Sequence, residues 1–312
     1  MMFSRLATFA IWLTFAVIIL GAATRLADAG LSCPDWPLCY GEVIPFPESK
    51  IAGGYVVEGT HYVAEQVALE YAHRLTAALV GVLLLGMMLY LPTQRPRVWV
   101  ATGVAFALLA AQIKLGALTV WLGNIHWSVA IHLGNAMLFL GALAWARRAS
   151  VSSEFAINPA PRWAMPAVAL TALCVWATMM LGAFISSGYA GGICGGLFSC
   201  QGEWIPQDML QLMHMKHRYL ALATFILVMV VSAAGKRSGS PLLIKPAKAM
   251  QHVVGLQVIL GIFTLYSFSH FPHAYHALSL AHLTVGTALW FVLVGTMLNL
   301  VYGLSGRFHQ DR

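Results

Sequence analysis

Charged residues are scarce in this chain, which has 11 Asp and Glu and 18 Lys and Arg among its 312 residues. They make up 9% of the composition, far below the roughly 25% of soluble globular domains, so an ordinary soluble domain is excluded. Apolar residues account for 59% and lie in long uncharged runs, such as 75–91, 98–113 and 291–302. Runs of this length predict helices that cross a membrane.

Apolar segments of about 20 residues predict eight membrane-spanning helices. Their approximate ranges are 6–27, 69–91, 97–121, 127–146, 163–186, 211–234, 247–269 and 277–303. The expected fold class is therefore an all-α polytopic membrane protein, and no segment resembles a soluble domain. The first segment leads into Arg25 and a cysteine loop without a small-residue cleavage site, which favours a retained helix over a signal peptide.

Positive charges are concentrated on one side of the predicted topology. Twelve of the 18 Lys and Arg lie at the termini or in the connections after the second, fourth and sixth segments. The positive-inside rule then predicts cytoplasmic N- and C-termini in the lipid bilayer of the cell's inner (plasma) membrane. Nine of the 11 acidic residues lie in or beside the opposite loops. The net charge of +7 thus reflects membrane orientation and does not indicate nucleic acid as a partner.

The second half of the chain repeats short motifs of the first. The segment 70–74 is matched by 214–218, and the segment 112–116 is matched by 257–261. Because each half has four predicted helices, the repeats are expected to be parallel, as two pseudo-twofold four-helix bundles. The expected bounds of the two halves are 1–150 and 160–312.

Four of the five cysteines lie in the two large outer loops. Cys33 and Cys39 are six residues apart, and the same spacing returns between Cys194 and Cys200. The outer side of a cell membrane is oxidising, so each pair is predicted to form a disulfide within its own loop. Free thiols or metal ligands are the alternative. Cys174 lies within a predicted helix and is interpreted as a small apolar filler.

Four histidines lie at similar depths toward the outer ends of the predicted helices: His73, His132, His217 and His282. One pair falls in each repeat, an arrangement in which two facing imidazoles can ligate a haem iron between helices. A zinc site would require further ligands, which the segments do not offer. Any one of these histidines could instead be a packing residue, although ionisable groups at membrane depth are often functional.

Glu70 precedes His73 by one helical turn, so both side chains project from one helix face. A carboxylate beside a haem can accept a proton or stabilise a cationic intermediate. The second repeat has His214 in its place, which indicates one catalytic site and one cofactor site. The alternative for Glu70 is a helix N-terminal carboxylate at the membrane interface. Arg74 and Arg218 are candidates for pairing with haem propionates, or for snorkelling to the interface.

Taken together, these motifs resemble the heme A synthase family over nearly the whole chain. The residues that carry the resemblance are Gly21-Ala-Ala-Thr-Arg25, Gly30-Leu-Ser-Cys33-Pro-Asp-Trp-Pro-Leu-Cys39, Glu70-x-x-His73-Arg74, Gln112-x-x-x-Gly116, His132, Cys194, Cys200, His217-Arg218 and Gln257-x-x-x-Gly261. The resemblance implies an eight-helix pseudo-twofold bundle that oxidises the C8 methyl of heme O to the formyl of heme A. Oxidation would proceed by successive hydroxylation through an alcohol.

The resemblance also implies roles for single residues, carried over by position. His217 and His282 would ligate a resident haem b as cofactor, and His73 and His132 would hold heme O as substrate. Glu70 would be the catalytic acid. The sequence identifies neither the electron donor nor the partner that delivers heme O, for which the heme O synthase is a candidate. Whether copies of the chain form a homo-oligomer is left open.

One segment, 270–282, is richer in histidine than the family pattern. Its spacing from the preceding glutamine fits His276 as the ligand in the last helix. Depth favours His282, because His276 would leave 31 residues before Arg307, too many for one span. The remaining histidines are interpreted as a solvated interfacial cluster, with a loop metal site as the alternative: His270, His273 and His276.

Two other functions remain open from the residues alone. A cytochrome b type transmembrane electron carrier also uses paired histidines, but it would gain from haems stacked across the bilayer, whereas these four lie at one level. A transporter is compatible with parallel repeats, but nothing at the predicted midplane resembles a substrate site. Formation of heme A from heme O would distinguish the first interpretation from both.

Overall fold

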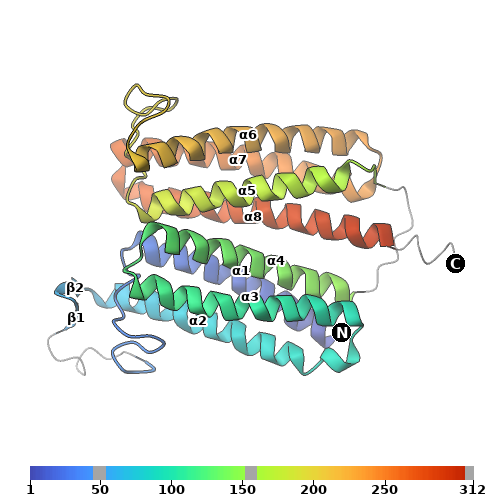
Figure 1. Ribbon diagram of the computed structural model, residues 1–312, viewed down its shortest axis with the longest axis horizontal. Helices are drawn as coiled ribbons and strands as arrows, with labels where there is room; N and C mark the ends of the chain where they lie inside the picture. The colour runs from blue at the N-terminus through green and yellow to red at the C-terminus, as the bar shows by residue number, and fades with distance from the viewer. Residues whose placement is uncertain (45–53, 152–159, 306–312) are drawn as a thin grey trace.

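Long helices make up nearly all of the regular structure in the computed structural model, which describes residues 1–44, 54–151 and 160–305 (Figure 1). The long helices of that part are α1 (Met2–Leu26), α2 (Ala64–Met88), α3 (Pro96–Trp121), α4 (His126–Ser150), α5 (Ala164–Ser187), α6 (Met209–Arg237), α7 (Pro241–His270) and α8 (Pro272–Ser305). All eight are long and apolar enough to cross a membrane. The predicted all-helical fold with eight candidate spans is therefore confirmed.

The helix ends follow local signals that average hydropathy does not detect. Proline is the first residue of α3, α7 and α8, where its fixed φ and missing N–H suit the first turn. Asp208 caps α6 by accepting hydrogen bonds from the amides of Leu210 and Gln211. α2 begins at Ala64, five residues earlier than predicted, because its first turns are polar and escape a search for apolar runs.

The junction of α7 and α8 differs from the expected loop. α7 ends at His270 and α8 begins at Pro272, so only Phe271 separates them. His276 therefore lies within α8, and the described residues contain no group of three or more possible metal ligands. A loop metal site is thus not supported. His270 instead stacks on Tyr266, with ring centroids 3.9 Å apart.

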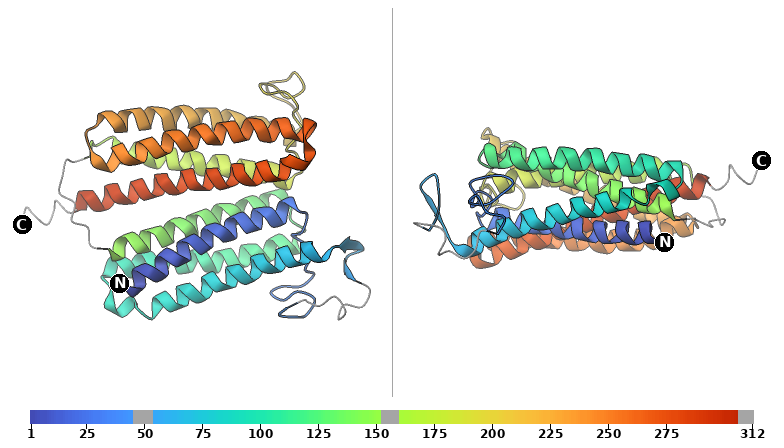
Figure 2. Two further views of the ribbon diagram at one scale, coloured as in Figure 1. Left: turned by 180° about the vertical axis from the view of Figure 1, so that it is seen from behind. Right: turned by 90° about the horizontal axis from the view of Figure 1, so that it is seen from below.

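The helices run side by side along one long axis (Figures 1 and 2). α1–α4 occupy one part of the molecule and α5–α8 the other. The most extensive helix contacts join α7 to α8, α3 to α4 and α1 to α2, while α4 meets α5 and α8 across the centre. The N-terminus and the last described turn of α8 lie at the end opposite the cysteine loops, as an even number of spans requires.

The main core lies where the two parts meet. Met137, Leu140 and Leu143 of α4 are fully buried in one cluster with Leu293 and Leu300 of α8. α3 and α7 keep most of their surface outside this core, as expected of helices that face lipid. α4 and α8 therefore form the central framework of the molecule, and each of them also carries one of the candidate histidines, His132 and His282.

The two disulfide loops have the same build. Disulfides join Cys33 to Cys39 and Cys194 to Cys200, with Cα–Cα distances of 4.8 and 4.5 Å. The second cysteine of each pair forms an antiparallel bridge to the third residue after it. The two residues within each bridge have positive φ values, as in a type I′ turn. The predicted pairing within each loop is confirmed.

The first loop also carries a β-hairpin that the second loop lacks among the described residues. β1 (Tyr55–Val57) and β2 (Thr60–Tyr62) pair antiparallel. Glu58 and Gly59 connect them with φ values of 48° and 82°, which a type I′ turn requires. Tyr55 is buried in one cluster with the first disulfide, so the hairpin covers that bond.

Candidate functional site

The four candidate histidines occupy equivalent places, two in each half: His73 on α2, His132 on α4, His217 on α6 and His282 on α8. Each ring lies against a glycine of the preceding helix. A Cβ atom added to that glycine would approach the ring Cε1 to 2.7 Å at Gly21, 3.2 Å at Gly116, 3.3 Å at Gly182 and 3.0 Å at Gly261. A side chain at these positions would crowd the imidazole, so the glycines set where each ring can lie.

His217 and His282 face each other with ring centroids 6.5 Å apart. Two imidazoles that bind one metal ion at about 2 Å each have centroids roughly 6 Å apart, which is close to this separation. His217 Nδ1 donates to the carbonyl of Thr178 at 3.0 Å, and His282 Nδ1 to that of Gln257 at 3.1 Å. A carbonyl only accepts, so each Nδ1 carries the hydrogen and each Nε2 keeps a lone pair. Both rings of the second half are thus oriented by backbone carbonyls.

The first half holds its histidines less firmly. His73 Nδ1 lies near the carbonyl of Val17, without a hydrogen bond of normal geometry to any described residue. The side-chain amide of Gln112 lies 3.3 and 3.2 Å from the two ring nitrogens of His132. Asn135 donates to the Gln112 side-chain oxygen at 2.7 Å, which turns the amide N–H groups toward His132. These rings are less strictly oriented than their counterparts in the second half.

His282, and not His276, is the neighbour of His217. His276 is exposed six residues earlier in α8 and lines a surface cavity. The side-chain amide of Gln257 lies 3.3 Å from His282 Nε2, in the same relation as its counterpart in the first half. The sequence analysis favoured His282 over His276 because of its expected depth in the membrane, and His282 is the residue that the structure places beside His217.

Glu70 is buried, with 3% of its surface exposed, beneath the first disulfide loop. Its Oε2 accepts hydrogen bonds from Ser32 Oγ at 3.0 Å and from the Cys33 amide at 2.9 Å. Its Oε1 pairs with Arg74 at 2.6 Å. Glu70 lies in the second turn of α2 and is shielded from solvent by these contacts. The sequence did not indicate its bonds to the loop.

Arg74 and Arg218 hold the two disulfide loops in the same way. Arg74 donates to the carbonyls of Cys33, Asp35 and Leu38. Arg218 donates to the carbonyls of Cys194, Gly196 and Leu197. The expected pairing of these guanidiniums with haem propionates therefore competes with a loop-holding role that the structure displays.

The surroundings of the two loops differ in polarity. His214, the counterpart of Glu70, is buried, and its Nε2 donates to the Gly191 carbonyl at 3.2 Å. The second disulfide packs with Met215, whereas the first packs within a cluster of tyrosines. Burial and the neighbouring Tyr62 raise the pKa of Tyr40 to about 12, so its hydroxyl stays protonated at neutral pH. The first loop is the more polar and the more extensively bonded.

Comparisons with known proteins point to one family. The model of the family described as cytochrome oxidase assembly protein, COX15-CtaA, matches residues 4–294. A protein named heme A synthase from Rhizorhabdus wittichii is 28% identical over 316 residues, covering 89% of each chain. Another protein of that name, from Shewanella oneidensis, is 34% identical over 202 residues, 62% of this chain and 59% of the relative. A protein named protoheme IX farnesyltransferase 1, from Natronomonas pharaonis, is 31% identical over 156 residues, 49% of this chain and 30% of the relative.

Proposed function

This chain belongs to the COX15-CtaA family of cytochrome oxidase assembly proteins, and from that premise we propose that it is a heme A synthase. The proposed enzyme is a membrane oxidoreductase that converts the C8 methyl of heme O to the formyl of heme A by successive hydroxylation. One observation carries the proposal: each half has a histidine pair, but only the second pair is fixed by backbone carbonyls.

The chain is proposed to form two parallel four-helix bundles, 1–150 and 160–312, related by a pseudo-twofold axis along the membrane normal. The recurrence of glycine–histidine contacts and of disulfide loops at one end supports this arrangement. The positive-inside rule then places the termini in the cytoplasm and the loops outside the inner membrane. Disulfides in both loops agree with an oxidising outer side.

A resident haem b is proposed to be held by His217 and His282. When bound, it would supply one-electron redox chemistry. The carbonyls of Thr178 and Gln257 would keep both Nε2 lone pairs directed at the iron, as outer acceptors do in other metal sites. Ligands fixed in this way suit a group that stays bound through many turnovers.

Heme O is proposed to bind between His73 and His132. A substrate must enter and leave in each turnover, and rings that lack backbone acceptors of normal geometry among the described residues suit exchange. Gln112 and Asn135 would hold His132 at the correct depth by side-chain contacts alone. The first half would therefore be the substrate half.

Glu70 is proposed to be the catalytic carboxylate. It lies one helical turn before His73, and hydrogen bonds to Ser32 and the Cys33 amide hold it in one orientation. In a water-poor place, a carboxylate can accept a proton or stabilise positive charge as the methyl group is oxidised. Arg74 pairs with the other oxygen of Glu70 and would hold the carboxylate in place from the second side.

The heme O synthase is proposed as the partner that delivers the substrate. The relative from Natronomonas pharaonis supports this pairing, because a protein named for farnesylation of protoheme IX contains a region similar to half of this chain. A covalent link between a haem-farnesylating unit and a unit similar to this chain would favour direct transfer of an insoluble haem from one to the other. An electron donor would complete the set of partners.

Haem extraction after expression tests the proposed function. In membranes supplied with heme O, the wild-type chain should yield heme A together with retained haem b. Two low-spin haems with heme O left unconverted would favour a cytochrome b type electron carrier instead. A chain that binds no haem would contradict both accounts and favour a transporter.

A further inference from the structure

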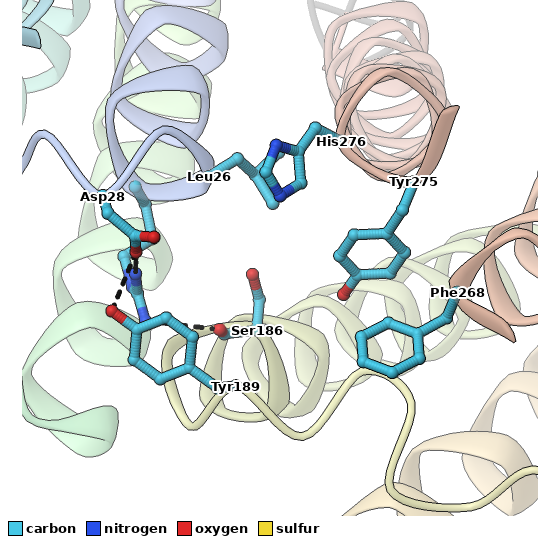
Figure 3. Close-up of a pocket in the computed structure, with 8 residues that line it drawn as sticks. Leu26, Asp28, Ser186, Tyr189, Phe268, Tyr275 and His276 are labelled. Carbon is cyan, nitrogen blue, oxygen red and sulfur yellow. Dashed lines mark hydrogen bonds and ion pairs between the residues drawn. The ribbon is translucent and has the colours of Figure 1, made fainter. Parts of the chain in front are cut away.

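Two cavities lie at the loop end of the molecule where the halves meet, and Arg25, Asp28 and Tyr189 line both. One cavity, of about 280 Å³, adjoins the end of α7 and the start of α8, with Phe268 and His276 in its wall (Figure 3). The other, of about 380 Å³, adjoins the hairpin, α2 and the turn before α4. The smaller cavity thus lies mostly against the second half and the larger one mostly against the first, and residues of both halves line each.

Arg25 joins the two halves at this place. Its Nη1 pairs with Asp28 at 3.1 Å, and its Nη2 donates to the carbonyl of Ser187 at 2.8 Å. Its Cζ lies 4.3 Å from the centroid of the Tyr189 ring, and Tyr189 donates to Asp28 at 2.8 Å. The Nε–H of Arg25 is buried and has no hydrogen-bond partner in the part of the chain that the structure describes. A buried cationic donor without an acceptor is costly, and an anionic ligand would satisfy it.

Arg25 lies one turn outside the level of both histidine pairs. Gly21, which contacts His73, precedes Arg25 by four residues on the same face of α1, a rise of about 6 Å. On α5, Gly182 contacts His217, and the carbonyl of the residue four positions later accepts from Arg25 at 3.5 Å. One guanidinium thus stands between the outer edges of the two proposed haem sites.

Each cavity is lined by a histidine that has an equivalent in the other repeat, and the first-half cavity is also lined by His61 of the hairpin. His126 lines the first-half cavity and His276 the second-half cavity. Each precedes the proposed haem ligand of its own helix, His132 or His282, by six residues, about 9 Å nearer the outer end. His126 Nδ1 is buried without a partner among the described residues. The two cavities therefore share an arginine and repeat a histidine.

We propose that these cavities bind the propionate carboxylates of the two haems, with Arg25 as their shared anchor. The inference rests on the proposed function, since it needs a haem in each half. Ionised carboxylates are costly within hydrocarbon, so the propionates must point to the nearer, outer membrane surface. There Arg25, together with His276 in the second half and His126 beside His61 in the first, offers N–H donors, while Asp28 and Tyr189 hold the guanidinium in place. Arg25 takes the role that the sequence suggested for Arg74 and Arg218.

Binding of iron protoporphyrin IX and of its dimethyl ester to the full-length apo-protein tests the proposal. The ester keeps the iron and the ring but removes both carboxylate charges. The wild type should bind the free acid at least tenfold more tightly than the ester, as a charge-assisted hydrogen bond predicts. The two sites are measured separately in His132→Ala and His282→Ala backgrounds, by the low-spin absorbance of the haem in the other half.

Substitutions then assign the donors. Arg25→Gln should reduce the preference for the free acid at both sites, while His276→Gln should reduce it only in the second half and His126→Gln only in the first. His273→Gln is the matched control, because His273 is exposed on α8 and outside both cavities. The dimethyl ester and Arg25→Gln should be non-additive, because each removes the same ion pair.

Equal affinity of the wild type for the acid and the ester would overturn the proposal without any variant, so it stays testable even if Arg25→Gln fails to insert. An unchanged preference in Arg25→Gln would overturn it as well. Either result leaves the proposed function standing, provided that low-spin haem is bound. Absence of haem from the wild type would contradict the proposed function itself.

Discussion

The two halves of this chain share one framework and differ in which part of it is held firmly. In the second half, the backbone carbonyls of Thr178 and Gln257 fix both histidine rings. In the first half, the rings lack such carbonyl bonds of normal geometry among the described residues, and it is the disulfide loop that is bound by Glu70, by a hairpin and by tyrosines. The difference shows that the same helix order can hold equivalent histidines in two different ways.

Electrostatics follows the same division. The first half places a buried carboxylate–guanidinium pair, Glu70 and Arg74, beneath its disulfide loop. In the second half, His214 and Arg218 hold the disulfide loop by donating to its backbone carbonyls, without a carboxylate. A buried ion pair is an expensive way to hold a loop, because desolvation offsets much of its attraction. The charge in the first half is therefore more readily explained by chemistry than by stability alone.

The largest effect is expected from His282→Ala, which removes a fixed ligand of the proposed resident haem. The variant should insert normally and lose the low-spin spectrum of haem b, because one imidazole cannot complete axial ligation. His276→Ala, in the same helix but exposed, should keep the spectrum. The reverse outcome, loss in His276→Ala alone, would transfer the assignment and remove the basis for the comparison of the halves.

Glu70→Gln should lower the rate of heme A formation by about 10²-fold or more while leaving haem b in place. The amide keeps the size of the carboxylate and can still accept from the Cys33 amide, so insertion should be normal. Heme O or the hydroxylated intermediate should accumulate, measured by chromatography of extracted haem.

Ser32→Ala is the control for Glu70→Gln, because it removes one hydrogen bond to the carboxylate and leaves its charge. It should retain most of the activity. If Glu70→Gln forms heme A at close to the wild-type rate, Glu70 serves the loop only, and the first half has no acid of its own for the reaction.

Much of this arrangement was predictable from the sequence. Eight spans follow from hydrophobic runs, and the disulfides follow from equal cysteine spacing in outer loops. His282 was selected over His276 because the length of a span constrains depth. These are properties of segments and spacings, which a chain displays before it folds.

The other features of the site could not be predicted, because they depend on how each helix is rotated about its axis and on which groups the long side chains reach. Arg74 and Arg218 are long enough to reach either a loop carbonyl or a propionate, so spacing does not decide between them. The contact of Gly21 with His73 joins two helices, and no local pattern reports which faces meet. The start of α8 was placed too late because His273 and His276 interrupt the apolar run.

Alanine substitutions at Gly21 and Gly182 test whether the two halves hold their histidines differently. A Cβ at Gly21 would lie 2.7 Å from His73, whereas one at Gly182 would lie 3.3 Å from His217. Overpacking typically costs about 1–3 kcal/mol, so Gly21→Ala should weaken heme O binding roughly tenfold or more. Gly182→Ala should keep haem b with a smaller change. Titration of heme O and of haem b measures both, and equal effects would show that the distances do not govern ligation.

Removal of one disulfide should have the smallest effect. Each loop closes a short ring, for which loop-closure entropy contributes about 2 kcal/mol. Replacing Cys194 and Cys200 by serine should lower thermal stability modestly and keep haem b. The same change at Cys33 and Cys39 should also slow heme A formation, because the Cys33 amide orients Glu70. Equal activity of both double variants in a stability-matched assay would contradict this link.

The most direct test of the division between the halves is the haem content of His132→Ala, purified from membranes that supply heme O. Our account predicts that haem b is retained in its low-spin form by the second half and that no heme A is formed. Heme A in the extract at the wild-type level, or loss of haem b together with activity, would contradict the assignment of substrate to the first half and cofactor to the second.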